Sequence, residues 1–272
     1  MHGRVGVVGF ATPGCRARTG IAGNLTRVLC SLTLTYMLTL DRDRQIVMSV
    51  ARFQQLSAGH LRSMLFDDLA SQTPLDRALK RLVDRKYLAR IERRMVGGKG
   101  AGSGQYVYQL GRQGWLLAGR EKKYWPFRAV DYHTLAIADA FVEVLELQHR
   151  GRIEILNYIT EPETRTHIGG VELRPDLTLE VDDLLNGRTV TLWVEVDMGT
   201  ERLSVIKAKL ASYWHAYENA PESLRVFPQV LFLAADNDRA KELRWAVEQG
   251  SREAQGLFVV STVREFAGLY FS

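Results

Sequence analysis

Cysteine is nearly absent from this 272-residue chain, which contains only Cys15 and Cys30. Two cysteines outside any Cys-x-x-Cys pair exclude a disulfide framework and a cysteine-rich zinc site. The six histidines are scattered and none has His-Glu-x-x-His spacing, so they predict no histidine metal centre. With 46% hydrophobic and 25% charged residues, the composition predicts a globular protein of the cytoplasm.

Long apolar runs are also missing. The most apolar stretch, Leu25 to Leu40, carries Arg27 and is diluted by serine and threonine. A membrane-spanning helix needs about 20 predominantly apolar residues, so we expect no membrane segment. Asp41 and Asp43 stand where a signal peptide would have its small-residue cleavage site. We interpret residues 1–42 as a leader that is poorly ordered or that precedes the true start codon.

Motifs of common catalytic and nucleotide-binding sites are absent as well. There is no Gly-x-Ser-x-Gly nucleophile elbow, and Val5 to Gly9 does not complete a dinucleotide fingerprint. The tract from Gly97 to Gly104 has five glycines in eight residues but lacks the Lys-Ser/Thr of a phosphate-binding loop. We interpret this tract as the flexible tip of a β-hairpin.

Charge is distributed unevenly along the chain. Residues 1–120 contain 19 Lys+Arg and 7 Asp+Glu, a net charge of +12, whereas the remaining 152 residues contain 17 and 24, a net charge of −7. A basic half attracts a polyanion, and a uniformly spread +5 would not. The asymmetry therefore indicates a nucleic acid as partner of the N-terminal half.

The basic half has the outline of a winged helix-turn-helix domain, which we assign to residues 43–120. Apolar residues from Ile46 to Leu56 recur at helical spacing, and Ser57 can cap a second, short helix. Thr73-Pro74 begins a third helix, with proline in its first turn. Strands are predicted at 87–96 and 105–110, on either side of the glycine tract, and a short closing helix at 111–119.

The third helix and the hairpin present cations that suit a DNA backbone. A recognition helix enters the major groove while flanking cations neutralise phosphates. The alternatives are a solvated surface and a protein-interaction module. The residues that we expect to bind double-stranded DNA are Arg77, Lys80, Arg81, Arg85, Arg93, Arg94 and Lys99.

After a linker at 121–130, helices and strands alternate through a second domain at 131–272. The predicted order is α-β-β-β-α-β-α-β, with a helix at 132–150 and strands at 153–160, 173–181 and 189–198. A helix at 201–217 is followed by a strand at 228–235, a helix at 239–248, a strand at 257–261 and a short helix at 263–269. This order predicts an α/β fold with a mixed sheet flanked by helices.

Three carboxylates are expected to converge on that sheet. Asp176 begins one strand, and Glu195 and Asp197, two residues apart on the next, point to the same face. Carboxylates gathered in this way favour Mg²⁺ or Mn²⁺, which can activate water for phosphodiester hydrolysis. The alternative is an acidic sheet edge paired with neighbouring lysine and arginine.

These residues carry a resemblance to known families. Pro175-Asp176 followed by Glu195-Val196-Asp197 resembles the PD-(D/E)xK motif of the restriction-endonuclease-like fold, but the lysine of the motif falls at Asp197. The run from Glu195 to Glu201, with Lys209-Leu210 and Tyr213 behind a winged helix, resembles the replication-relaxation family of plasmids and other bacterial mobile elements. That resemblance implies a DNA-associated role in replication or relaxation.

The missing lysine decides whether the second domain is expected to be catalytic. Lys207 and Lys209 lie on the following helix, and either side chain could substitute, with Lys209 our catalytic candidate. Glu143 or Glu146 could add a fourth acid. We expect a DNA-binding replication or copy-number factor whose second domain does not cut. A divalent-metal nuclease using Asp176, Glu195 and Asp197 and a dimeric transcriptional repressor are the alternatives. Homodimerisation and contact with other replication proteins are further expectations.

Overall fold

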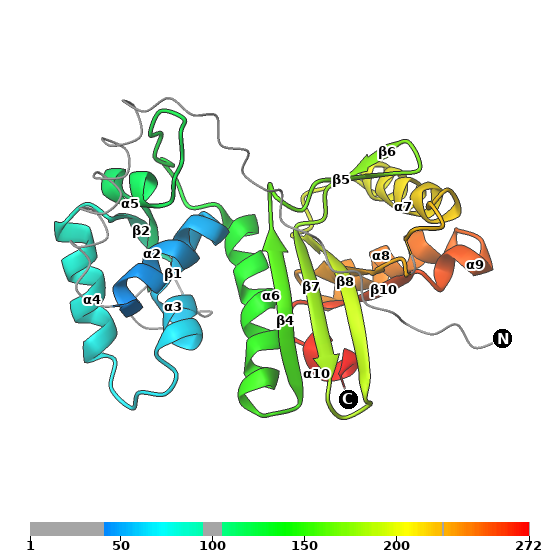
Figure 1. Ribbon diagram of the computed structural model, residues 1–272. Helices are drawn as coiled ribbons and strands as arrows, with labels where there is room; N and C mark the ends of the chain where they lie inside the picture. The colour runs from blue at the N-terminus through cyan, green and yellow to red at the C-terminus, as the bar shows by residue number, and fades with distance from the viewer. Residues whose placement is uncertain (1–40, 95–104, 225, 272) are drawn as a thin grey trace. The chain divides into compact units, whose positions relative to one another are not determined.

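The computed structural model describes residues 41–94, 105–224 and 226–271 (Figure 1). The leader up to residue 40 and the glycine tract with Lys99 lie outside the described residues. Contacts divide the chain into two compact units, and the division falls between Leu135 and Ala136. The domain limits expected from the sequence stay a prediction.

The N-terminal unit combines short helices with a small antiparallel sheet, in the strand order β1-β3-β2. The expected helices and the two expected strands are present, whereas β1 was not predicted. The elements are α2 (Asp41–Phe53), β1 (Gln55–Ser57), α3 (Ala58–Leu65), α4 (Thr73–Asp84), β2 (Leu88–Arg94), β3 (Gln105–Leu110) and α5 (Arg112–Leu117).

Local sequence explains where α3 and α4 begin. Ser57 caps α3 as expected: its Oγ accepts a hydrogen bond from the His60 backbone N–H at 3.1 Å, and His60 Nδ1 accepts one from the Ser57 N–H at 3.2 Å. Helix α4 has Pro74 in its first turn, where a missing N–H costs nothing. Leu75, Leu79 and Leu82 on its inner face are fully buried and hold α4 against the unit.

Two buried glutamines fix the segment that follows α5. Gln109 donates to the Phe127 carbonyl at 2.9 Å and accepts from the Phe127 N–H at 2.7 Å. Gln55, its partner across the β1–β3 ladder, donates to the Ala129 carbonyl at 3.2 Å and accepts from the Asp131 N–H at 2.9 Å. Each amide side chain both donates to and accepts from this backbone, so residues 127–131 are held beside β1 and β3.

The C-terminal unit is built on a five-stranded mixed sheet in the order β10-β9-β8-β7-β4 (Figure 1). Strands β4, β7 and β8 are antiparallel, whereas β8, β9 and β10 are parallel and are joined by helices. The elements are α6 (Tyr132–His149), β4 (Ile153–Thr160), β5 (Thr166–Ile168), β6 (Val171–Leu173), β7 (Leu177–Asp183), β8 (Arg188–Asp197), α7 (Leu203–Glu218), β9 (Gln229–Ala234), α8 (Asn237–Glu248), α9 (Arg252–Gln255), β10 (Phe258–Thr262) and α10 (Phe266–Tyr270).

This arrangement confirms the expected α/β class and corrects one strand. Residues 173–181 do not form a single strand: β6 ends at Leu173 and β7 begins at Leu177. Pro175 between them has no N–H to give to a ladder, which favours a break there. The break places Asp176 directly before β7, at the edge of the ladder with β8. None of the helices in the described ranges is both long and apolar enough to cross a bilayer.

Helices α7 and α8 cover the parallel half of the sheet. Their apolar side chains, Ile206 and Tyr213 on α7 and Leu243 on α8, share one buried cluster with Trp193 of β8 and Phe232 of β9. Burying these aromatic and aliphatic surfaces fixes the position of both helices against β8 and β9. Polar groups on α7 and α8 are therefore held at set distances from the carboxyl end of β8.

Candidate functional site

The three predicted carboxylates lie at the carboxyl end of β8, and all are buried: Asp176 is 6% exposed, Glu195 4% and Asp197 4%. The Asp176 backbone N–H donates to the Val194 carbonyl at 2.9 Å, and the Val196 N–H donates to Asp176 Oδ2 at 2.7 Å. The Asp176 carboxylate is thus bound to the backbone of Val196, the residue between Glu195 and Asp197. The three carboxylates therefore lie near one another at this end of β8, and their role as a catalytic or metal site stays a prediction.

Glu195 is held by two residues of α7. Tyr213 donates its hydroxyl hydrogen to Glu195 Oε1 at 2.5 Å, and Lys209 Nζ donates to Oε2 at 3.0 Å. Lys209 Nζ also lies 3.2 Å from Glu201 Oε2. Burial and the nearby Asp176 carboxylate raise the pKa of Glu195 to about 7, against the lowering effect of Lys209 and Tyr213. Burial and the Glu195 charge raise the pKa of Tyr213, which keeps its hydroxyl a donor.

Asp197, at the lysine position of the motif, is held by a different helix. Arg239 of α8 donates to Asp197 Oδ2 from Nη2 at 2.7 Å and from Nε at 3.2 Å. The Gly199 N–H donates to Asp197 Oδ1 at 2.6 Å. Arg239 also reaches the Glu201 carbonyl and Glu242, and its pKa is raised by its hydrogen bond to Asp197. The position that corresponds to the lysine of the motif is therefore an aspartate paired with a partly buried arginine.

The structure shows which of the two lysines, Lys207 or Lys209, reaches the carboxylates. Lys209 points to Glu195, whereas the Lys207 ammonium lies 4.5 Å from the centre of the Trp245 ring. The proposed fourth acids are engaged elsewhere. Glu146 pairs with Arg150 at 3.0 Å, and burial, with Glu146 and Asp139, raises the pKa of Glu143.

The side-chain oxygens described above do not fit a Mg²⁺ site in this arrangement. Both Glu195 oxygens and both Asp197 oxygens already accept hydrogen bonds, and Asp176 Oδ2 accepts one from β8. Mg²⁺ needs oxygen ligands in near-ideal octahedral geometry. No three His, Cys, Asp or Glu residues in the described ranges are grouped so that they could hold a metal. Lys209 and Arg239 supply the positive charge here.

The raised pKa of Glu195 predicts a pH dependence of stability. The folded state keeps a proton on Glu195 up to a pH of about 7, whereas an unperturbed glutamate releases it near 4.5. The stability that this proton contributes is complete below pH 4.5 and is lost as pH rises to 7, by about 3 kcal/mol for the full shift. We expect Glu195→Gln to remove this decline in urea titrations.

A matched control for that measurement is Glu248→Gln, which changes an exposed glutamate at the end of α8. The control should keep the wild-type pH dependence between pH 4.5 and 7. If Glu195→Gln keeps it as well, Glu195 titrates like an exposed carboxylate, and the electrostatic description of the site is wrong.

The outer face of α4 is the second candidate site. Arg77 and Lys80 are exposed on it, and the exposed Arg85 directly follows the helix. Lys80 pairs with Asp84 at 2.7 Å, and such an exposed pair contributes little to stability. Arg81 differs from its neighbours. It donates to both oxygens of Asp43 on α2, at 2.8 and 2.6 Å, and Asp43 is 1% exposed. Arg81 therefore joins two helices.

The hairpin cations are only partly described. Arg93 and Arg94 lie on β2, opposite Tyr106 and Gln105 of β3, but their side chains and the whole of Lys99 lie outside the described residues. Arg90, which was not among the expected DNA contacts, is exposed, and its guanidinium lies 4.7 Å from the centre of the Tyr106 ring.

Sequence reasoning missed Arg239, Tyr213 as the partner of Glu195, and Glu201. Tyr213 stands four residues after Lys209, so helical spacing gave a signal that both face one side of α7. Arg239 gave none, because 42 residues separate it from Asp197. Only the parallel arrangement of β8 and β9 brings the start of α8 to the end of β8.

Comparison with known proteins identifies a family. No curated protein and no solved structure matches the chain significantly. Residues 48–230 match the family model described as Replication-relaxation, which covers most of both units and includes α4, Asp176, Glu195, Asp197 and Lys209. The match extends over more than half of the sequence and includes the residues that suggested the resemblance. The chain therefore belongs to the replication-relaxation family.

Proposed function

We propose that this protein binds double-stranded DNA through α4 and acts in replication or relaxation of a mobile element without cutting the DNA. Family membership supports the general role. The observation that carries the DNA-binding part is the exposed cationic face of α4, whose opposite face is buried against its own unit. A helix held in this way can enter the major groove with its cations on phosphates or base edges.

The element order around α4 supports the same conclusion. Three helices are followed by the strand pair β2–β3, the order of a winged helix-turn-helix module. In such a module the helix and the hairpin face the same duplex, so Arg90, on the strand that leads to the tip, adds to the cations of α4. We retain Arg77, Lys80 and Arg85 as DNA contacts and assign Arg81 to the link with Asp43.

The C-terminal unit supports the second part of the proposal. A nuclease of the PD-(D/E)xK type needs carboxylate oxygens open to a metal and a lysine that can reach the attacking water. Here Lys209 is bound to Glu195 and Glu201, and Arg239 is bound to Asp197. The contact of Lys209 with Glu195 places a lysine beside the predicted carboxylates, and this observation favours the rival function, a metal-dependent nuclease.

Incubation with supercoiled plasmid and Mg²⁺ or Mn²⁺ separates these functions. We expect the bound protein to retard the plasmid on a gel. After the protein is removed, the plasmid should still be supercoiled. Glu195→Ala should give the same two results as the native chain. Nicking or linearisation that disappears in Glu195→Ala would establish a nuclease. An unretarded plasmid, with no binding to short duplexes at low salt, would contradict the DNA-binding role.

The site of binding separates replication from transcription. Footprinting on DNA of the element that encodes the protein should protect its replication origin. Protection of a promoter alone would favour a dimeric repressor, since winged helices often bind two half-sites as dimers. Sedimentation of the free and DNA-bound protein would then give the number of copies on each site.

A further inference from the structure

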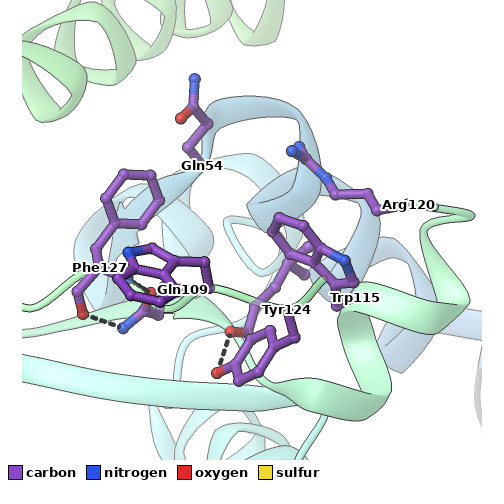
Figure 2. A pocket seen from close by; sticks show the side chains of 8 residues that line it. Gln54, Gln109, Trp115, Arg120, Tyr124 and Phe127 are labelled. Carbon is purple, nitrogen blue, oxygen red and sulfur yellow. Dashed lines mark hydrogen bonds between the residues drawn. The ribbon is translucent and has the colours of Figure 1, made fainter. Parts of the chain in front are cut away.

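A small aromatic hollow lies in the N-terminal unit, between the end of α2, strand β3 and the segment that follows α5 (Figure 2). Its volume is about 210 Å³. Figure 2 shows Phe127 on one side of the hollow and Trp115 with Arg120 on the other. Tyr124 and Trp125 complete the aromatic lining. This volume is below the range of drug-sized ligand sites, so it suits a single ring system.

The walls of the hollow are held in place by hydrogen bonds to the backbone. Trp115 Nε1 donates to the Lys122 carbonyl at 2.7 Å, and the Tyr124 hydroxyl donates to the Leu110 carbonyl at 3.2 Å. The two rings meet edge to face with centroids 5.8 Å apart. The Phe127 backbone is held by Gln109. The polar ends of Trp115 and Tyr124 are therefore satisfied, and both rings are held as fixed walls of the hollow.

Two of the lining rings are exposed to solvent: Trp125 is 68% exposed and Phe127 42%. Exposed apolar residues that adjoin one another, as these two do at the hollow, can mark a binding site. The segment that carries Tyr124, Trp125 and Phe127 is rich in cations, of which Arg120 also donates to the Ala51 carbonyl at 2.6 Å. Residues 120–128 contain four Lys or Arg and one acid, and Lys122, Lys123 and Arg128 are exposed. The guanidinium of Arg120 lies 5.0 Å from the centre of the Trp115 ring, and that of Arg128 lies 6.0 Å from that of Trp125.

We infer that this hollow binds an unpaired base of single-stranded DNA, by stacking on Trp125 and Phe127 while the surrounding cations contact the adjacent phosphates. Aromatic rings beside a positive surface are the means by which proteins hold single strands without reading their sequence. An apolar peptide would gain from the rings but not from the four cations. The inference rests on the proposed DNA-binding role and adds a second, separate surface to it.

Fluorescence anisotropy with a labelled oligo(dT) of about 15 nucleotides tests the inference, because thymidine runs form no duplex. We expect Trp125→Ala to weaken oligo(dT) binding about tenfold and to leave binding of a short duplex unchanged. Trp125→Phe, which keeps a ring, should retain most of the affinity. Trp245→Ala removes a partly exposed tryptophan of the C-terminal unit and is the matched control.

The outcomes separate this inference from the proposed function. Duplex binding without oligo(dT) binding, or equal oligo(dT) affinity in Trp125→Ala and the native chain, would overturn the inference and leave the duplex role standing. If the native chain binds oligo(dT) but no duplex, and Trp125→Ala loses the oligo(dT) binding, the result would support single-strand binding at the hollow and contradict duplex binding through α4. Unchanged oligo(dT) affinity together with a Trp125→Ala shift from dimer to monomer in sedimentation would assign the hollow to a second copy and overturn the inference. Unchanged circular dichroism of Trp125→Ala verifies that the variant is folded.

Discussion

Replacing Arg239 by alanine is expected to lower the free energy of unfolding of the C-terminal unit by about 3–5 kcal/mol. The Asp197 carboxylate is 4% exposed and the Arg239 side chain 11%. Without Arg239, Asp197 would keep only the Gly199 N–H as a described partner and would remain in a site that water barely reaches. An isolated charge in such a site must be desolvated without compensation or take up a proton, and either outcome costs stability.

Urea unfolding followed by circular dichroism measures this loss as a shift of the midpoint at constant slope. Arg244→Ala is the matched control, because Arg244 is an exposed arginine on the same helix and donates a long, 3.4 Å hydrogen bond to the Val260 carbonyl. The control should cost less than about 0.5 kcal/mol. The pair Arg239→Met with Asp197→Asn should recover most of the loss, since removing both charges leaves no uncompensated ion.

A loss below about 1 kcal/mol in Arg239→Ala would contradict this description of Asp197. The carboxylate would then be stable without its arginine and accessible to another cation. In that case the metal-binding role expected from the sequence would regain support. The stability of one variant thus bears directly on whether this end of β8 is a structural charge network or the remains of an open metal site.

The sequence predicted the elements better than it predicted their contacts. Helical and alternating periodicity identified α4, α6, β4 and β8 closely, because each is long enough to show its period. Strands β1, β5 and β6 have three residues each, too few to show alternation. Pro175, interpreted as part of a strand, separates two strands, because a residue without an N–H favours a ladder end.

The candidate site was predicted where local geometry determines it and missed where topology does. The i, i+2 spacing of Glu195 and Asp197 was enough to place them together near the end of β8. Neither spacing nor charge could show that Arg239 approaches Asp197, since that contact depends on the order of the strands. The same holds for the pairing of Arg81 with Asp43, since 38 residues separate the two and only the packing of α4 against α2 brings them together.

Removing the cations of Arg77 and Lys80 together is expected to weaken duplex DNA binding about 100-fold. Each lost contact to a phosphate or a base costs about 1–3 kcal/mol, and about 1.4 kcal/mol is a factor of ten. Both side chains are exposed on α4, and the apolar face of the helix is untouched, so Arg77→Ala with Lys80→Ala should stay folded. The native chain should lose affinity steeply with salt, and the double variant less so.

The salt dependence of duplex binding distinguishes direct phosphate contacts by Arg77 and Lys80 from attraction by the net charge of the protein. For B-DNA the logarithm of affinity falls with the logarithm of salt concentration by about 0.9 for each neutralised phosphate. If both side chains bind phosphates, the slope should decrease by nearly two in the double variant. Lys241→Ala with Arg252→Ala is the matched control, because it removes the same charge from exposed positions of the C-terminal unit.

An equal loss of affinity in the control pair and in the Arg77, Lys80 pair would mean that net charge alone governs binding. The cationic face of α4 would then contribute no more to DNA binding than other exposed cations, and its assignment as a recognition helix would be wrong. A loss of affinity confined to the α4 pair, with a slope that stays unchanged, would instead indicate contacts to base edges, since those displace no counterions from phosphate. The affinity lost with base contacts should also differ between duplexes of unrelated sequence, whereas the affinity lost with phosphate contacts should be the same for all of them.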